Sequence, residues 1–276
     1  MLEYALIKGR YYENGRITFR INSYCTLECE HCLRGEKEVV NMSTVVLDEI
    51  AKSEVRIERL LLTGGEPLIA IQALEYLAEL IKNKKIKVSK LVLITNGTIK
   101  SERVLRVLRD FQNSTHLILK LSTDVFHQVD LERKGLLELR DRNLGEYNQA
   151  GFYNFSKYGG DYKRFPRHSL TGKGRAATIS SERLKEIGNL AGVEFVVDDG
   201  KNIIRDIFWD EGKLHGSITI DVYGNVVEYG LSFKEEDEFA YEHGWNITQM
   251  PFREAVQAFV DNNTVIYEEA FNKLGL

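Results

Sequence analysis

Three cysteines, Cys25, Cys29 and Cys32, are the only ones in the chain, and they fall together in one short stretch. Thiolates are soft ligands for zinc, copper(I) or iron and sulfide, and such short gaps let one loop place its sulfurs around a single centre. A zinc site with His31 is one alternative, but His31 is adjacent to Cys32, and adjacent side chains rarely converge on one small ion. A four-iron cluster held by three thiolates instead leaves one iron free to bind a substrate or cofactor. The odd number of cysteines also argues against a disulfide framework and favours a reducing compartment.

The spacing Cys-x3-Cys-x2-Cys after a first strand, with His31 directly before the third cysteine, resembles the signature of radical S-adenosylmethionine enzymes. The resemblance implies a [4Fe-4S] cluster bound by Cys25, Cys29 and Cys32, whose open iron is chelated by the amino and carboxylate groups of S-adenosylmethionine. One electron, from a donor such as a flavodoxin or ferredoxin, then cleaves the sulfonium and gives a 5′-deoxyadenosyl radical. In such enzymes the cofactor carries the difficult chemistry and the protein positions it.

A second motif follows an apolar strand, where Thr63, Gly64, Gly65 and Glu66 precede a proline. It matches the Gly-Gly-Glu motif of the same family, which implies a contact with S-adenosylmethionine. Glycines let a backbone approach a ligand closely, and the exposed carbonyls and Glu66 can accept hydrogen bonds from an ammonium such as the methionyl amine. An ordinary strand-to-helix turn is the alternative interpretation.

Three later segments carry further candidate cofactor contacts. Asn96 follows a buried strand that is similar to the third or fourth strand of the family's barrel. Ser122 and Asp124 end another strand two residues apart, so their side chains share a face and could reach the ribose hydroxyls, or could simply cap the next helix. Arg175 lies in a Gly-Arg-Ala segment that resembles one in which the arginine contacts cofactor in some members. A solvated basic turn is the alternative for Arg175.

Strand-like and helical patterns alternate along the chain, which predicts parallel βα units. Strands are expected at residues 16–22, 57–63, 89–95, 115–122, 164–170 and 193–197, and helices at 71–81, 101–111 and 184–191. The motifs all follow strands, where barrel enzymes assemble their active sites. We therefore predict an α/β fold, a partial (β/α)6 TIM-like barrel. An Asn-Gly turn adds an N-terminal hairpin that would lay residues 3–10 beside the first strand.

Residues 213–276 are predicted to form a small C-terminal extension to a barrel domain of residues 1–212. Residues 217–228 predict two strands around a Tyr-Gly-Asn turn, and a helix is expected at 251–261. This hairpin and helix are similar to the extension of the SPASM/Twitch subgroup, where the hairpin brings cysteines to auxiliary clusters. The tail has no cysteine here, so the alternative is a hairpin and helix that close the open edge of the barrel.

Residues 141–175 form a long, polar, tyrosine-rich stretch of the kind that is usually functional or mobile in a compact domain. We expect either a loop that covers the barrel mouth or an irregular surface connection. Because no fourth cysteine remains to donate hydrogen to a substrate radical, tyrosine is the available side-chain donor. The candidate donors are Tyr147, Tyr153, Tyr158 and Tyr162.

Composition narrows the expected partners and location. The 276 residues include 37 Lys plus Arg and 41 Asp plus Glu, a net charge of −4, and the two signs are interspersed, so nucleic acid is not an expected partner. No apolar stretch approaches the ~20 residues that cross a bilayer, and the N-terminus lacks a signal-peptide pattern. We therefore expect a cytoplasmic protein that does not use a membrane.

The substrate is the least constrained part of the prediction. The tail's similarity to peptide-modifying relatives favours a peptide or protein side chain, and a small metabolite or nucleoside is the alternative. A non-enzymatic zinc or iron-sulfur binding module is the competing class of protein. The Gly-Gly-Glu turn at Gly64 and the strand end at Ser122 and Asp124 distinguish the two classes, because a bare metal module needs no nucleoside site.

Overall fold

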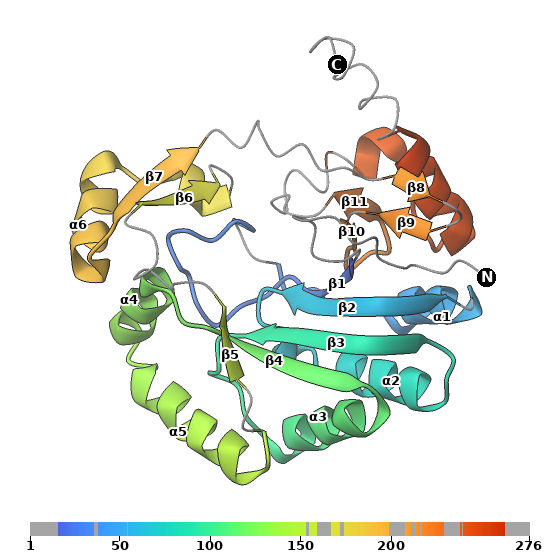
Figure 1. Cartoon of the computed structure of the whole chain (residues 1–276), viewed down its shortest axis with the longest axis horizontal. Coiled ribbons are helices and arrows are strands. Elements are labelled where there is room, and N and C mark those ends of the chain that lie inside the picture. Colours follow the sequence, from blue (N-terminus) through green and yellow to red (C-terminus); the bar gives the residue numbers. More distant parts are fainter. Residues whose placement is uncertain are drawn as a thin grey trace.

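A computed structural model describes residues 16–35, 38–53, 55–152, 155–158, 167–171, 174–198, 208–210, 213–215, 217–228, 238 and 240–262. Its largest element is a seven-stranded sheet (Figure 1). The strands of this sheet are β1 (Arg16–Asn22), β2 (Arg56–Gly64), β3 (Lys87–Thr95), β4 (His116–Ser122), β5 (Phe155–Tyr158), β10 (Ser217–Ile220) and β11 (Val226–Glu228). Their spatial order is β11-β10-β1-β2-β3-β4-β5, and every neighbouring pair except β10 with β11 is parallel.

Helices follow the strands as the alternating pattern predicts. They are α1 (Thr44–Lys52), α2 (Ile71–Lys82), α3 (Glu102–Ser114), α4 (Val125–Arg133), α5 (Leu137–Gln149) and α6 (Ser181–Ala191), with 3-10 turns η1 (Pro67–Ile69) and η2 (Gly174–Thr178). Ser101 shows why α3 begins where it does, because its side chain accepts a hydrogen bond from the Val104 amide at 3.2 Å. The helices predicted at 71–81, 101–111 and 184–191 are therefore confirmed.

The main hydrophobic core lies between the sheet and the helices packed on it. In Figure 1, α2 and α3 lie side by side against one face of the sheet, and α1 contacts α2. Alternate residues of the central strands, such as Leu60 and Leu62, are fully buried in this core. The tail reaches the same core, because residues 252–262 are helical and bury Val256 and Phe259 there.

A second, smaller core lies beneath the loop that carries the cysteines. Leu27 and Cys29 of that loop pack against residues of α4, of α6 and of β7 (Glu194–Asp198). The members of this cluster are Leu27, Cys29, Phe126, Leu131, Leu184, Ile187 and Phe195. The cysteine-bearing segment therefore has hydrophobic contacts of its own, away from the main core.

The last two predicted strands exist but leave the main sheet. β6 (Arg167–Thr171) pairs in parallel with β7, and the two form a separate sheet beside α6 (Figure 1). The sixth parallel strand of the main sheet is instead β10, which pairs with β1 from the other end of the chain. The architecture is still the predicted α/β partial barrel, with six parallel strands in the main sheet.

The tail hairpin forms around the predicted turn, and it completes the sheet. β10 and β11 are antiparallel, and Gly224 between them has a φ of +91°, a conformation that favours glycine. Asp221, just after β10, is fully buried with Arg20 of β1, 3.6 Å away. The hairpin therefore extends the main sheet beyond β1. The division at residue 212 stays a prediction, and the hairpin predicted for residues 3–10 lies outside the described residues.

The tyrosine-rich stretch is not a single long loop. Residues 141–175 include most of α5, the strand β5, the strand β6 and the start of η2. The sequence does not predict α5, because the apolar periodicity of this helix is weak. Its buried residues are Asn143 and Tyr147. In the part of the chain that the structure describes, no helix is long and apolar enough to span a membrane.

Candidate cluster and cofactor site

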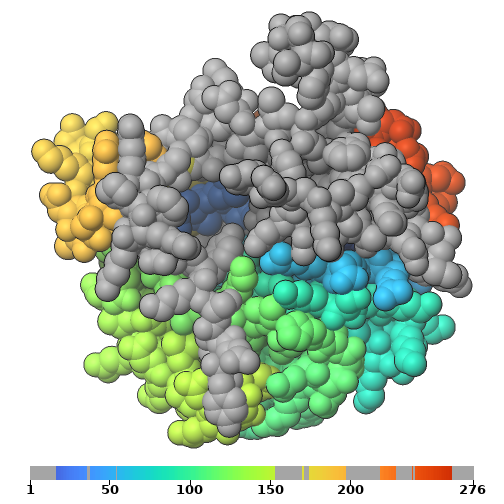
Figure 2. Space-filling view, in the orientation of Figure 1, coloured from blue at the N-terminus to red at the C-terminus, as the bar shows by residue number. Residues whose placement is uncertain are grey.

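The three cysteines lie on one loop between β1 and α1, which we call the cysteine loop (residues 23–43, with 36–37 not described). Cys29 is buried, whereas Cys25 and Cys32 are half-buried. The Cys25 sulfur accepts hydrogen bonds from the Leu27 amide at 3.4 Å and from the Asn96 side-chain amide at 3.5 Å. Hydrogen bonds of this kind to cysteine sulfur tune iron-sulfur centres. In Figure 2, deep-blue atoms of the segment that contains this loop are visible beside the yellow and orange β7 and α6.

The environment of Cys29 suits a metal-bound thiolate. Burial raises the pKa of the Cys29 thiol well above its ordinary value, and the nearby carboxylates of Asp130 and Asp124 raise it further, as do Cys25 and Cys32. An isolated thiolate here would be unfavourable, because it would be desolvated and surrounded by negative charge. A bound cation removes both penalties and deprotonates the thiol. The donor set of the loop therefore fits an iron centre.

The structure brings one of the three cysteines close to other potential metal ligands. Around a tetrahedral zinc the ligand sulfurs lie about 3.8 Å apart, given a Zn–S bond of about 2.3 Å. Among the described residues, the group of potential ligands whose atoms all lie within 4.8 Å of one another is Cys29, His31 and His127, and the three cysteines do not form such a group. A cluster of several irons spans a wider set of thiolates.

The Gly-Gly-Glu turn packs directly on the cysteine loop. A Cβ added at Gly65 would lie 2.1 Å from the Tyr24 carbonyl oxygen and 2.8 Å from the Cys25 nitrogen. The Glu66 amide donates to the same Tyr24 oxygen at 2.7 Å, and Gly64 has a φ of +150° that favours glycine. The close approach that these glycines allow is to the chain's own backbone. The expected contact of this turn with S-adenosylmethionine stays a prediction.

Glu66 is bound inside the fold. Its carboxylate is fully buried and accepts hydrogen bonds from the Thr95 hydroxyl at 2.9 Å, the Asn96 amide at 2.8 Å and the Leu68 amide at 3.1 Å. Burial raises the pKa of Glu66 to about 7, although the hydrogen bonds from Asn96, Leu68 and Thr95 lower it in part. The carboxylate therefore joins the ends of β2 and β3. The predicted bond from Glu66 to a methionyl ammonium stays a prediction beside this internal role.

Asn96 and Thr63 lie at the carboxyl ends of two neighbouring strands, β3 and β2. The Asn96 side chain donates to Cys25 and to the Thr26 hydroxyl, the latter at 3.1 Å, and accepts from the Thr98 amide at 2.9 Å. Asn96 therefore holds the cysteine loop against the strand end. Thr63 is half-buried beside the same rim, and its predicted contact with cofactor stays a prediction.

Ser122 and Asp124, at the end of β4, have different structural roles. Ser122 is buried at the end of β4, whereas Asp124 caps α4 and accepts a hydrogen bond from the His127 amide at 3.0 Å. Asp124 also lies 2.6 Å from His127 Nδ1 and 3.5 Å from His31 Nε2. Burial alone would raise the pKa of Asp124, but the two histidines hold it well below its usual range. The capping alternative is confirmed, and Asp124 is bound to histidines in this structure.

Arg175 holds the cysteine loop from the side opposite the Gly-Gly-Glu turn. Its guanidinium donates to the main-chain oxygens of Cys29 at 3.0 Å and of Gly35 at 2.5 Å, and its amide donates to the Cys32 oxygen at 3.0 Å. A Cβ added at Gly174 would lie 2.6 Å from that Cys32 oxygen. Arg175 is half-buried and bonded to the loop rather than part of a solvated turn, and its predicted contact with cofactor stays a prediction.

Of the candidate tyrosines, the structure describes the side chain of Tyr147 and the backbone of Tyr158. Tyr147 is fully buried in α5, and its hydroxyl donates to the main-chain oxygen of Ile99. Burial also raises the pKa of Tyr147. Tyr158 ends β5 opposite Ser122, and Tyr153 and Tyr162 lie outside the described residues. Tyr147 is thus a core residue, which corrects its placement in an accessible loop.

Several residues of the site were not predicted. His127 contacts Asp124 from the first turn of α4, and Asp130 accepts the Glu28 amide of the cysteine loop at 2.6 Å. Arg183 of α6 binds both carboxylate oxygens of Glu30, with bonds of 2.7 to 3.1 Å. The sequence offers one signal for His127, because it stands three residues after the predicted Asp124. The other contacts depend on tertiary docking and leave no local pattern.

Residues 19–160, just over half of the chain, match the family model of the Radical SAM superfamily. The chain therefore belongs to the radical S-adenosylmethionine superfamily. It is an enzyme of that superfamily, whose cofactors are a [4Fe-4S] cluster and S-adenosylmethionine, and the class of non-enzymatic metal module is set aside. The partial barrel described above is consistent with the fold of this family.

Several solved structures are similar to this chain in backbone structure. SuiB from Streptococcus suis, bound to precursor peptide SuiA, is 14% identical with a TM-score of 0.45, over 77% of this chain and 58% of SuiB. BtrN in complex with AdoMet and 2-DOIA is 12% identical with a TM-score of 0.45, over 92% of this chain and 85% of BtrN. The enzyme anSMEcpe with bound AdoMet and Cp18Cys peptide is 16% identical with a TM-score of 0.43, over 87% and 80% of the two chains. The chain thus spans under two thirds of SuiB, and no curated protein matches it.

Proposed function

We propose that Cys25, Cys29 and Cys32 bind the [4Fe-4S] cluster, and that S-adenosylmethionine binds beside it at the carboxyl ends of the central strands. The substrate that we propose is a peptide or protein side chain, from which a hydrogen atom is abstracted. When bound, the cluster supplies one electron for reductive cleavage of S-adenosylmethionine to a 5′-deoxyadenosyl radical. The observation that carries the proposal is the packing of Gly65 on the backbone of Tyr24 and Cys25, which joins the two motifs.

The chain's own residues hold the thiols in position for this role. Asn96 donates to the Cys25 sulfur, and Arg175 donates to the backbone of Cys29. Burial of Cys29 excludes water from one side of the centre. Because the loop is fixed from two sides before the cluster binds, little ordering should be needed at that step.

The cofactor contacts that we propose follow from the same rim. The main chain at Thr63 and Gly64 and the side chain of Ser122 lie at the carboxyl ends of β2 and β4. Glu66, Asn96 and Asp124 support the cofactor site indirectly, because each is bonded to other residues of the fold. His31, next to Cys32, lies beside Asp124 and completes the proposed boundary of the cofactor pocket.

The proposed substrate class is supported by the form of the tail. The hairpin of β10 and β11 and the helix at 252–262 resemble the extension of peptide-modifying relatives, without its cysteines. The acidic net charge of −4 is a weaker argument against polynucleotides. A small metabolite or a nucleoside is the alternative outcome of the test below.

The first experiment tests the cluster ligands. The protein is purified and reconstituted without oxygen, and iron, sulfide and 5′-deoxyadenosine formed with dithionite are measured. We expect a bound cluster and 5′-deoxyadenosine in the wild type, and neither in a variant with Cys25, Cys29 and Cys32 replaced by Ala. Far-UV circular dichroism of that variant should be unchanged, because apolar strands and not the loop build the main core. A variant that still holds near four irons per chain would disprove the ligand assignment.

The second experiment tests the substrate class. The reconstituted enzyme is supplied with a random peptide library, with a nucleoside mixture or with a metabolite mixture, and 5′-deoxyadenosine is compared with the substrate-free rate. A peptide substrate should raise the yield and give a product of changed mass. Stimulation by the nucleosides or metabolites alone would select the alternative. Replacing dithionite by reduced flavodoxin or ferredoxin tests the proposed electron donors.

A further inference from the structure

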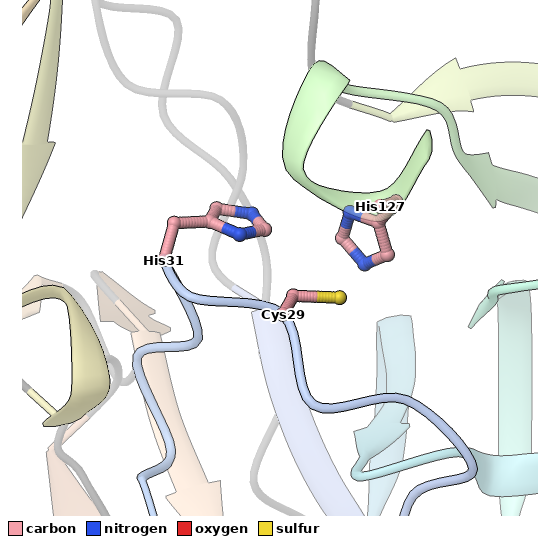
Figure 3. Close-up of side chains that lie close together, drawn as sticks. All are labelled: Cys29, His31 and His127. Atoms are coloured by element: carbon pink, nitrogen blue, oxygen red, sulfur yellow. The ribbon is translucent and has the colours of Figure 1, made fainter. Parts of the chain in front are cut away.

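A second group of metal-binding side chains meets at the cysteine loop. Cys29 and His31 come from the loop and His127 from the first turn of α4, and Figure 3 shows the Cys29 sulfur directed toward the His127 ring. One potential ligand atom from each residue lies within 4.8 Å of the other two. A tetrahedral zinc site needs such atoms about 3.5 Å apart, so a rotation of side chains that closes about 1 Å would complete it.

Asp124 orients both histidines as a carboxylate beside a metal site usually does. Its carboxylate lies 2.6 Å from His127 Nδ1 and 3.5 Å from His31 Nε2. Histidines that bind metals usually donate a hydrogen bond from their second ring nitrogen to a carboxylate or carbonyl, which fixes the ring and raises its basicity. The nitrogens left for a ligand are therefore His127 Nε2 and His31 Nδ1.

His31 Nδ1 provides an independent observation. This atom is buried and makes no hydrogen bond in the structure, although buried ring nitrogens normally have a partner. The ring is held there by stacking on Phe126, with centroids 4.6 Å apart, and it meets His127 edge to face at 5.1 Å. A fixed imidazole with an unused nitrogen beside a thiol lacks the ligand that would satisfy it.

We propose that Cys29, His31 and His127 bind a single divalent cation of zinc type when the loop holds no cluster. One thiolate and two neutral imidazoles form a donor set that suits Zn²⁺ and excludes hard ions such as Mg²⁺ or Ca²⁺. Binding releases the Cys29 thiol proton to solvent, and one coordination position stays open for water. Asp124 is the positioning residue for both imidazoles.

The two metal centres share one ligand, so they exclude each other. The proposed cluster requires Cys29 together with Cys25 and Cys32, whereas the divalent site requires Cys29 with the two histidines. A chain loaded with zinc is consequently unable to accept a cluster until the ion leaves. The divalent site does not depend on the radical chemistry, because it belongs to the cluster-free chain.

The test uses the full chain, prepared without cluster and without oxygen. Zn²⁺ affinity is measured by competition with a chromophoric chelator, and Co²⁺ serves as a spectroscopic substitute that reports thiolate and imidazole ligation. We expect one ion per chain, with a one-thiolate charge-transfer band. Replacement of both Cys25 and Cys32 by Ala should leave the affinity unchanged, as should His116→Ala, an exposed histidine of β4.

Three variants should weaken the divalent site. His127→Ala and His31→Ala should each lower Zn²⁺ affinity by at least about 10-fold, and Asp124→Asn should lower it through the imidazoles. Circular dichroism and urea denaturation check that each variant folds. Equal affinity in wild type and both histidine variants would overturn the proposal. Loss of binding when Cys25 and Cys32 are replaced would also overturn it, because the ion would then sit on the three cysteines.

Cluster loading separates this site from the proposed function. His127→Ala should still take up iron and sulfide as the wild type does, because His127 is not a proposed cluster ligand. Zn²⁺ added first should slow reconstitution of the wild type and have a much smaller effect on His127→Ala. Zinc that leaves wild-type reconstitution unaffected would overturn the shared use of Cys29. Failure of the wild type to bind any cluster would count against the proposed function and leave the zinc measurement intact.

Discussion

The guanidinium of Arg175 donates a hydrogen bond to the main-chain oxygen of Cys29 at 3.0 Å, across a sequence separation of 146 residues. The cysteine loop is therefore shaped in part by η2, which lies between β6 and β7 along the chain. Arg183 of α6 adds a second link through Glu30. The unit that leaves the main sheet thus supports the loop that carries the thiols.

Arg175→Ala should loosen the cluster and leave the fold intact. The substitution removes the guanidinium bonds to the Cys29 and Gly35 oxygens, each worth about 1–3 kcal/mol for a charged donor. Iron should therefore be lost faster to a chelator in the reconstituted variant, while circular dichroism stays unchanged. Arg175→Lys keeps the charge but not the forked donor, so its rate of iron loss should lie between those of the wild type and Arg175→Ala. Equal rates of iron loss in all three proteins would contradict this role.

Gly65→Ala should displace the cysteine loop from the Gly-Gly-Glu turn. The added Cβ would lie 2.1 Å from the Tyr24 oxygen, and backbone on both sides has little room to move. We expect a destabilisation of about 1–3 kcal/mol and a reduced iron content after reconstitution. Gly145→Ala in α5 is the matched control, because a Cβ there meets nothing within 4 Å. Similar iron contents in the two variants would show that the close approach is unimportant.

Tyr147→Phe should not change the fate of the substrate radical. The Tyr147 hydroxyl is buried and bonded to the Ile99 oxygen, so its loss should cost about 1–2 kcal/mol of stability. Product formed in D2O should carry the same deuterium content in wild type and variant. If the variant alone lost solvent deuterium, Tyr147 would be the donor after all. The same measurement on Tyr153, Tyr158 and Tyr162 tests the remaining candidates.

The sequence was sufficient where local pattern determines structure. Apolar strands ending in Thr63 and Asn96, and a helix capped by Ser101, have the periodicities and caps of their elements, and the structure has them at those positions. The three cysteines were recognisable by spacing alone. Their predicted role as cluster ligands needs no tertiary information, because one loop supplies all three.

The sequence was insufficient where distant segments meet. Nothing near Glu66 indicates that Thr95 and Asn96 would occupy its carboxylate, and nothing near Asp124 indicates that His31 would approach it. Each contact follows from the register of neighbouring parallel strands and the path of the cysteine loop. The cofactor contacts predicted for Glu66 and Asp124 stay predictions beside these internal bonds.

The stability of the fold should depend on pH through Glu66. Its pKa is raised by burial to about 7 in the folded state, from 4.5 in the exposed state. The folded state therefore binds more protons than the unfolded state between these values, and the free energy of unfolding falls as pH rises through about 7. The full change in the free energy of unfolding is on the order of 3 kcal/mol. This stabilisation is fully present below the unfolded-state pKa of 4.5 and is lost as pH rises to about 7. Urea denaturation of the wild type and Glu66→Gln from pH 4 to pH 8.5 measures it.

In Glu66→Gln the side chain cannot ionise, so this part of the pH dependence should disappear. The wild type should lose stability relative to the variant as pH rises, because only the wild-type carboxyl must then hold a buried charge. Glu79→Gln is the control, since Glu79 is exposed on α2 and its replacement should shift stability little at any pH. A difference between wild type and Glu66→Gln that stays constant across this range would mean that the pKa of Glu66 is not raised in the fold, and that the bonds from Thr95 and Asn96 offset its burial.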